Sequence, residues 1–418
     1  MKKIILVSLL FIFTNSCNDI SYIKFIKTNF SEESSEPNLH TSDSGEIYLS
    51  YISSNLNSNE SKLFYSLFDF SNDSWGESNL IVKSSKMFVN WADFPKITAN
   101  ELNGISAHYL EMSSDEKYSY DIKVVNSKNK GNTWSIPLKL HSDNTKTEHG
   151  FVSTITHNNH FLSTYLDGRQ NELSKNDKSI KPQMTLRGTS YNIDGEILED
   201  QLIDNRVCDC CQTDLAITKN GKSIVVYRDR SRNEVRDIYY SYKDKNTWSN
   251  PISIFNDNWV ISGCPVNGPA ISTFNNTSAV VWYTFSNNNN QLKIAFSNDI
   301  SSGFDIPIII NANDPIGRVD IELLDGETAL ISYMDNIDGN TFVKLHMVNS
   351  SGNQNKLLII DESSENRSSG FPVITLDKEK NKTIIAWTEN KEKFKIKTAL
   401  VDNLFLFKIK TALVDNLF

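Results

Sequence analysis

The stretch AVVWYTFSNNNNQLKIAFSND, residues 279–299, contains the unit from which the chain is built. Two runs rich in β-branched and aromatic residues, Ala279–Tyr283 and Leu292–Phe296, flank a polar segment, as in a β-hairpin. The leading run recurs at Ile47–Ile52, Ile105–Tyr109, Phe161–Tyr165, Ile224–Tyr227, Ala329–Tyr333 and Thr383–Trp387. The returning run recurs at Leu63–Phe68, Tyr120–Val125, Thr185–Tyr191, Ile238–Tyr242, Phe342–Val348 and Phe394–Val401.

The hairpins repeat every ~50–60 residues, which is typical of a four-stranded propeller blade with its loops. Most have a strand-like run before them, such as Val152–Thr156, and one after them, such as Ile136–Leu140. The hairpin therefore supplies strands two and three of each blade. We predict an all-β fold, a β-propeller of seven four-stranded blades forming one domain over residues 18–405.

The last repeat lacks an obvious fourth strand, whereas the strand-like segment Ile20–Ile26 precedes the first repeat. Because a propeller protects its strand edges, we expect this N-terminal strand to complete the last blade and close the ring. Residues 394–405 recur as residues 407–418, and the second copy has no blade to join. We interpret 406–418 as a duplicated tail or a sequence-assembly artefact.

The N-terminus is typical of an export signal. Lys2 and Lys3 precede the apolar run Ile4–Phe13, which is too short to span a bilayer. Ser16 followed by Cys17 resembles a bacterial lipoprotein cleavage site, although Thr14 departs from its usual aliphatic residue. We expect residues 1–17 to be a lipoprotein-type signal peptide with Cys17 as lipid anchor, and hence a membrane-anchored periplasmic or cell-surface protein. Secretion without an anchor is the alternative. The net charge of −9 argues against a nucleic-acid partner.

Three turns that follow the returning runs carry a shared motif. Ser127–Trp134, Ser241–Trp248 and Ser297–Phe304 resemble the Asp-box, Ser-x-Asp-x-Gly-x-Thr-Trp, in which small residues form a tight turn and an aromatic residue fills a gap. With the blade pattern, they make residues 35–403 resemble the sialidase (BNR-repeat) superfamily. Sialidases have six blades, so the resemblance implies a six-bladed fold as the alternative.

Blade geometry predicts where the reactive residues gather. In a four-stranded blade, the start of strand one and the end of strand two lie at the same end, and the first strands line the central channel. Arginines and carboxylates at these positions suit an anionic or sugar-like ligand, so a glycan or other small anion is the expected partner. The alternative is that they form salt bridges between blades. The polar residues expected at this end of the propeller, which include one histidine and one asparagine, are Asp93, His149, Asp167, Arg169, Arg228, Arg230, Glu234, Asn267 and Arg318.

The resemblance assigns roles to some of these residues. Sialidases hold the substrate carboxylate with three arginines and use a tyrosine nucleophile, a glutamate and an acid/base aspartate. The resemblance implies Arg169, Arg228 or Arg230, and Arg318 as substrate-binding residues, with Asp167 and Asn267 beside them. The catalytic candidates are Asp93 and Glu234. The Phe-Arg-Ile-Pro motif of sialidases is missing, and no tyrosine is assigned as the nucleophile.

Four further cysteines form the second unusual feature. Cys208, Cys210 and Cys211 precede one blade and Cys264 precedes the next, so we expect them to lie close together. Export favours a disulfide, for which a bridge from the first three to Cys264 is easiest. Alternatively, the thiolates bind Zn²⁺ or Cu(I), with His149 as a further ligand, or the four cysteines remain free thiols.

Two hypotheses follow. The first is an exported, sialidase-like exo-glycosidase that acts on sialic acid or another acidic sugar. The second is a non-catalytic propeller that binds a soft metal ion or a partner through the cysteines.

Overall fold

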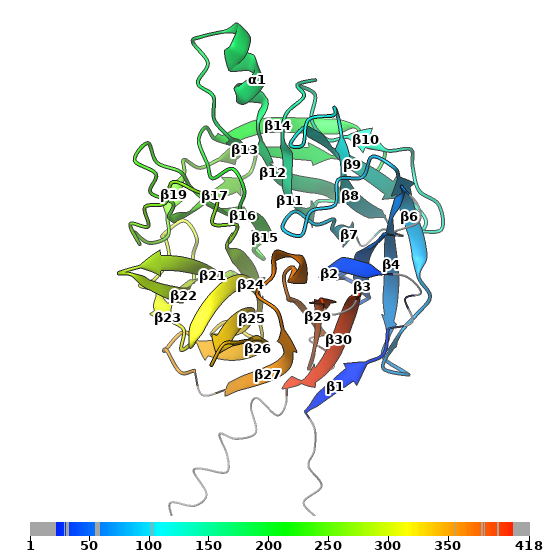
Figure 1. Ribbon diagram of the computed structural model, residues 1–418, viewed down its shortest axis with the longest axis vertical. Coiled ribbons are helices and arrows are strands. Elements are labelled where there is room, and N and C mark those ends of the chain that lie inside the picture. Colours follow the sequence, from blue (N-terminus) through cyan, green and yellow to red (C-terminus); the bar gives the residue numbers. More distant parts are fainter. Residues whose placement is uncertain are drawn as a thin grey trace, which may run out of the picture.

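The computed structural model describes residues 22–403, apart from residues 29, 31–32, 55–58, 101, 103, 355, 378, 380 and 391–392. Seven antiparallel sheets surround a common centre (Figure 1). The predicted signal peptide with Cys17, and the tail at residues 406–418, lie outside the described residues.

The first four blades follow one another along the chain, and each begins with its innermost strand. Blade 1 contains β2 (Ser34–Thr41), β3 (Ile47–Ser54), β4 (Ser61–Asp69), β5 (Ser74–Trp75) and β6 (Asn79–Ser84). Blade 2 contains β7 (Ile97–Ala99), β8 (Ile105–Met112), β9 (Tyr120–Ser127) and β10 (Leu138–Lys139). Blade 3 contains β11 (His149–His157), β12 (His160–Asp167), β13 (Thr185–Tyr191) and β14 (Ile197–Asp204). Blade 4 contains β15 (Asp214–Ile217), β16 (Ser223–Arg228), β17 (Ile238–Asp244), β18 (Thr247–Trp248) and β19 (Ile252–Ser253).

The last three blades complete the ring. Blade 5 contains β20 (Ala270–Phe274), β21 (Thr277–Ser286), β22 (Asn289–Ser297) and β23 (Ile308–Ile309). Blade 6 contains β24 (Asp314–Leu323), β25 (Thr328–Ile337), β26 (Asn340–Asn349) and β27 (Lys356–Ser363). Blade 7 contains β28 (Val373–Asp377), β29 (Lys382–Asn390), β30 (Phe394–Asp402) and β1 (Ile23–Ile26). A 3-10 helix, η1 (Arg367–Ser369), precedes blade 7.

The ring closes through the N-terminal strand. β1 pairs antiparallel with β30, with Ile23 opposite Val401 and Ile26 opposite Thr398, and the two strands lie side by side in Figure 1. The prediction that a segment preceding the first blade completes the last one is confirmed. The seven-blade count is also confirmed, and the six-bladed alternative is wrong for this chain.

Adjacent blades pack face to face, which explains why strand two is apolar on both sides. All six residues of β16 are buried. Val226 of β16 belongs to the same core cluster as Val280 and Trp282 of β21 in the next blade. A side chain on either face of an inner strand therefore leaves water, and that burial is the main stabilising contribution.

The turns after strand three anchor each blade to the one before it. In blade 2 the Ser127 hydroxyl accepts a hydrogen bond from the Gly131 N–H at 2.8 Å, which tightens the turn. Trp134 then packs edge-on against Tyr65 of blade 1, with ring centroids 6.1 Å apart. Trp75, which the sequence motif did not single out, occupies a similar position in blade 1 and donates its indole N–H to Thr398 Oγ1 at 2.9 Å.

One helix interrupts the propeller. The helix α1 (Arg169–Asn176) lies in the connection from β12 to β13 and projects outward from the ring (Figure 1). Among the described residues, no helix is long and apolar enough to cross a membrane.

Candidate functional site

The face where first strands begin and second strands end, here called the mouth face, gathers segments from most of the ring. The Gln212 side chain donates to Ala92 O at 2.6 Å and accepts from the Gly268 N–H at 3.0 Å, linking blades 2, 4 and 5. Trp91 stacks on Phe371 of the segment before blade 7, with centroids 5.8 Å apart. The structure thus brings the predicted segments together.

Two of the predicted substrate-binding arginines donate their hydrogen bonds to main-chain carbonyl groups. Arg228 donates to Asn267 O, Arg236 O and Tyr283 O at 2.6–3.0 Å. Arg318 donates to the carbonyls of Glu365, Asn366 and Gly370 at 2.8–3.1 Å. Both side chains are almost fully buried, and burial lowers the pKa of Arg318 to about 10.

These two guanidinium groups join neighbouring blades, so we do not retain them as ligand-binding groups. Asn267 has a similar structural position, because its Oδ1 accepts from the Arg318 N–H at 2.8 Å while its amide donates to Ile316 O at 3.1 Å.

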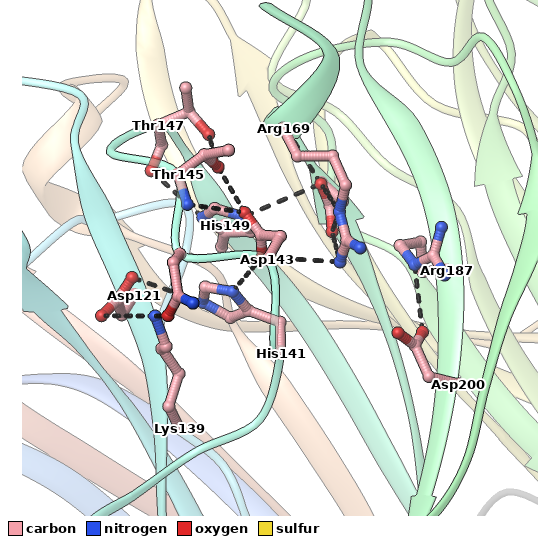
Figure 2. Close-up of polar contacts among 12 residues, drawn as sticks. Asp121, Lys139, His141, Asp143, Thr145, Thr147, His149, Arg169, Arg187 and Asp200 are labelled. Atoms are coloured by element: carbon pink, nitrogen blue, oxygen red, sulfur yellow. Dashed lines mark hydrogen bonds and ion pairs between the residues drawn. The ribbon is translucent and has the colours of Figure 1, made fainter. Parts of the chain in front are cut away.

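Arg169 and Asp167 belong to a buried ionic cluster, here called the histidine–aspartate cluster: Asp121, His141, Asp143, His149, Asp167 and Arg169 (Figure 2). Arg169 binds Asp167 through Nε at 2.8 Å and Nη2 at 2.5 Å. His141 Nδ1 lies 2.6 Å from Asp143 Oδ1, and the two imidazole rings stack with centroids 3.7 Å apart.

His149 lies at the centre of this cluster. Its Nδ1–H donates to Thr147 O at 3.1 Å, so Nε2 faces Asp143 Oδ2 at 3.2 Å and Asp167 Oδ1 at 3.7 Å. Two carboxylates opposite one nitrogen require a positive charge between them. Although burial opposes it, the hydrogen bond to Asp143 and the charge of Asp167 raise the pKa of His149. This arrangement favours the imidazolium form of His149.

The expectation that His149 joins the cysteines as a metal ligand is not retained, because its ring is already held by these groups. His149, Asp143 and Asp167 present atoms at metal-ligand separations. However, Arg169 already compensates the carboxylates, with its Nη2 also 3.6 Å from Asp143.

Glu234 and Arg230 form a second cluster in the connection from β16 to β17 of blade 4. Glu234 contacts three guanidinium groups: Arg236 at 2.7 Å, Arg230 at 3.1 Å and Arg206 at 3.4 Å. The hydrogen bond from Arg236 lowers the pKa of Glu234, so this carboxyl stays ionised. It is therefore poorly suited to the role of catalytic acid that the sequence implied.

Asp93 lies beside a carboxyl group that the sequence did not single out as catalytic. Asp93 Oδ1 accepts from the Phe151 N–H at 2.7 Å, and burial raises the pKa of Asp93 to about 8. Gly150 permits this approach, because a Cβ there would lie 2.0 Å from Asp93 Oδ2. Glu148 is half-buried next to it, and burial raises the pKa of Glu148 to about 7.

Tyr120 completes this group, and sequence reasoning missed it. Its hydroxyl donates to Glu148 Oε1 at 2.7 Å. Burial, together with the nearby carboxyls of Asp93 and Glu148, raises the pKa of Tyr120 well above its usual range. Its phenol therefore stays protonated. The only signal for the pair was the position of Glu148 at a first-strand start.

The four cysteines also meet on this face. Cys208 Sγ lies 3.4 Å from Cys211 Sγ and 4.0 Å from Cys210 Sγ. The Cys210 thiol also interacts with Cys264 and lowers the pKa of Cys264, so the sulfurs of these two residues are neighbours. Cys208 and Cys211 are buried, Cys210 is partly buried and Cys264 is exposed. Arg236 Nη1 donates to Cys208 Sγ at 3.0 Å. All four cysteines are free in the part of the chain that the structure describes.

The fold and this polar mouth define the class of protein as a β-propeller with a charged and thiol-bearing end face. Residues 45–377 match the family described as "BNR repeat-like domain", and the chain belongs to that family.

No curated protein sequence matches the chain. Three solved structures are similar. A Hadza microbial sialidase aligns with a TM-score of 0.48 and 13% identity over 76% of this chain and 66% of that one. A Dyadobacter fermentans protein of unknown function aligns with a TM-score of 0.49 and 14% identity, over 92% of this chain and 100% of that one. A Penicillium chrysogenum α-L-arabinanase aligns with a TM-score of 0.47 and 11% identity, over 89% of this chain and 94% of that one.

Proposed function

We propose that the chain is a glycosidase that binds an acidic sugar at the mouth face and hydrolyses its glycosidic bond. The observation that carries the proposal is a strip of ionisable groups, here called the acid strip, formed by Arg230, Asp209, Glu148 and Asp93. Arg230 lies 2.7 Å from Asp209, the charge of Asp209 acts on Glu148, and that of Glu148 acts on Asp93. Membership in the BNR repeat-like family agrees with the sialidase resemblance of the sequence, on which the choice of a sugar ligand rests.

The arginine end of the strip suits the anionic group of the sugar. Arg206 and Arg230 are 29% and 27% exposed, and with Arg236 they hold the Glu234 carboxylate. Guanidinium groups bind carboxylates strongly and with defined geometry. A sugar carboxylate can therefore compete with Glu234 for Arg206 and Arg230.

The acid end supplies the proton. A general acid works best when its pKa lies near the working pH, and Glu148 meets that condition at about 7. In glycoside hydrolysis such an acid protonates the leaving-group oxygen. The Tyr120 hydroxyl orients Glu148 through the 2.7 Å hydrogen bond and acts as a positioning residue. Activity should fall as the pH rises through about 7, because Glu148 then loses its proton.

Sialic acid carries a carboxylate on its ring and is one substrate of this type, and other acidic sugars share the chemistry. The test uses fluorogenic α-sialosides, uronides and neutral glycosides. Glu148→Gln should lower kcat by about 10²–10⁴-fold, the usual contribution of a general acid. Arg230→Ala should raise KM for acidic glycosides and leave neutral ones unchanged.

The matched control is Arg187→Ala, which breaks the 3.0 Å contact to Asp200 between β13 and β14. It should leave kcat and KM unchanged. No turnover on any glycoside, or turnover that survives Glu148→Gln, would contradict the proposal. Binding without turnover would leave the chain a sugar-binding propeller and would equally refute hydrolysis.

The lipid anchor is part of the same proposal. A lipid on Cys17 would hold the site at a membrane surface. Cys17→Ser should move the protein from the detergent phase to the aqueous phase in phase partitioning. Partitioning that is unchanged by this substitution would contradict the anchor.

A further inference from the structure

We propose that Cys208, Cys210, Cys211 and Cys264 bind one thiophilic metal ion, Cu(I) or Zn²⁺, at the mouth face. This inference does not require the glycosidase proposal, because its ligands are the four sulfurs, although Asp209 of the acid strip lies between Cys208 and Cys210. The four residues come from two segments. Cys208, Cys210 and Cys211 precede β15, and Cys264 lies between blades 4 and 5.

The sulfur positions fit a metal better than a disulfide network. The three sulfurs of the first segment all lie within 4.8 Å of one another, with two separations of 3.4 and 4.0 Å. Zn–S bonds of about 2.3 Å place the sulfurs of a tetrahedral site about 3.8 Å apart. A disulfide would need two sulfurs at about 2.05 Å, and pairing all four cysteines would require both a Cys208–Cys211 and a Cys210–Cys264 bridge.

The burial of the cluster supports the same assignment. Cys208 and Cys211 are 1% and 2% exposed, whereas Cys264 is exposed. Cys208 and Cys211 thus form the enclosed side of the cluster, Cys210 is partly buried, and Cys264 lies on the exposed side. Cys264 is therefore the ligand through which an ion would enter.

The charge around the cluster suits thiolates. Arg236 is 3% exposed and donates to Cys208 Sγ at 3.0 Å, so one guanidinium group lies directly on the sulfur cluster. Glu234 holds the same guanidinium at 2.7 Å and thereby fixes its position. Buried charge needs such compensation. Thiolate ligands select soft or borderline ions, which identifies the metal class as Cu(I) or Zn²⁺.

The first experiment measures metal per chain. The full chain, purified without oxygen, is incubated separately with ZnCl₂ and with Cu(I), dialysed, and analysed by mass spectrometry of the elements. We expect about one ion per chain for one of the two probes. Cys208→Ser and Cys211→Ser should lose it, and Cys264→Ser should bind at least tenfold more weakly. His149→Gln, the matched control, should keep the full amount.

Because the buried cysteine variants could unfold, Co²⁺ substitution of the wild-type chain provides a second readout. Sulfur ligation gives an intense sulfur-to-cobalt charge-transfer band, and circular dichroism of each variant checks its fold. Three results would overturn the proposal: much less than one ion per chain, metal binding that survives in a folded Cys208→Ser variant, or an intact mass showing a disulfide among these cysteines.

Discussion

The histidine–aspartate cluster and the cysteine cluster lie on the same face, and both contain buried groups that could bind a metal. They differ in how their charges are compensated. In the first, Arg169 binds Asp167 at 2.5 Å and His149 faces Asp143 at 3.2 Å, so cations and anions alternate. In the second, three sulfurs face one another, and the Arg236 guanidinium donates to one of them at 3.0 Å.

This difference indicates which cluster is a framework and which is a site. A buried polar group is costly unless it is paired, and the histidine–aspartate cluster pairs its own groups. It therefore holds the segment before blade 3 against the end of β12. The cysteine cluster has ligand atoms that lack such partners, so an added cation would complete it.

The largest expected effect breaks the self-paired cluster. Asp167→Ala would leave the Arg169 guanidinium and the His149 imidazolium without their shared carboxylate. Removing one partner of a buried ion pair typically costs about 3–5 kcal/mol. Urea unfolding at neutral pH should show a loss of that size in the free energy of unfolding. A loss below about 1 kcal/mol would mean that the cluster does not stabilise the fold.

The second effect is metal removal. A ligand that binds only the folded state stabilises it by about 2.7 kcal/mol at one hundred times its dissociation constant. Chelation should therefore lower the free energy of unfolding of the metal-loaded protein by about that amount. Cys211→Ser should be insensitive to the chelator, and His149→Gln should respond like the wild type. Equal sensitivity of Cys211→Ser and the wild type would place the metal elsewhere.

The third effect is the pH dependence of the free energy of unfolding. The direction of this dependence shows whether His149 is protonated or binds a metal. The raised pKa of His149 means that its stabilising contribution is fully present below about pH 6.5 and is lost as the pH rises through the folded-state pKa. The stability difference between wild type and His149→Gln should therefore shrink above neutrality, by up to about 1.4 kcal/mol per pH unit. A difference that grows with pH would instead indicate metal on the neutral imidazole.

The smallest effect is expected at a partly exposed pair. Arg187→Ala breaks an ion pair with Asp200 in which the side chains are 17% and 23% exposed. Such pairs are worth below about 1 kcal/mol because water and salt screen them. Thermal unfolding should show a minor shift. A shift as large as that of Asp167→Ala would remove the distinction between the buried cluster and an ordinary ion pair.

The sequence predicted the fold well because its signals are local and repeated. The hairpin pattern, the seven blades and the closing strand ending at Ile26 all depend on alternation and spacing that a single chain displays. The meeting of Cys208 with Cys264 followed from blade geometry in the same way.

The site was predicted less completely, because the hydrogen-bond partners of its side chains depend on how neighbouring blades place their backbones. Arg228 and Arg318 bind carbonyl groups whose positions only the assembled ring determines. The partner of His149 is Asp143, which lies in a connecting segment with no motif. The Tyr120–Glu148 pair depends on the register between blades 2 and 3, which the sequence does not display.

X-ray absorption at the metal edge of the anaerobically purified, metal-loaded chain tests the contrast between the two clusters most directly. The account predicts a first shell made of sulfur alone, at about 2.3 Å for Zn²⁺. A first shell of nitrogen and oxygen would place the ion in the histidine–aspartate cluster and contradict the account, as would a chain that takes up no metal.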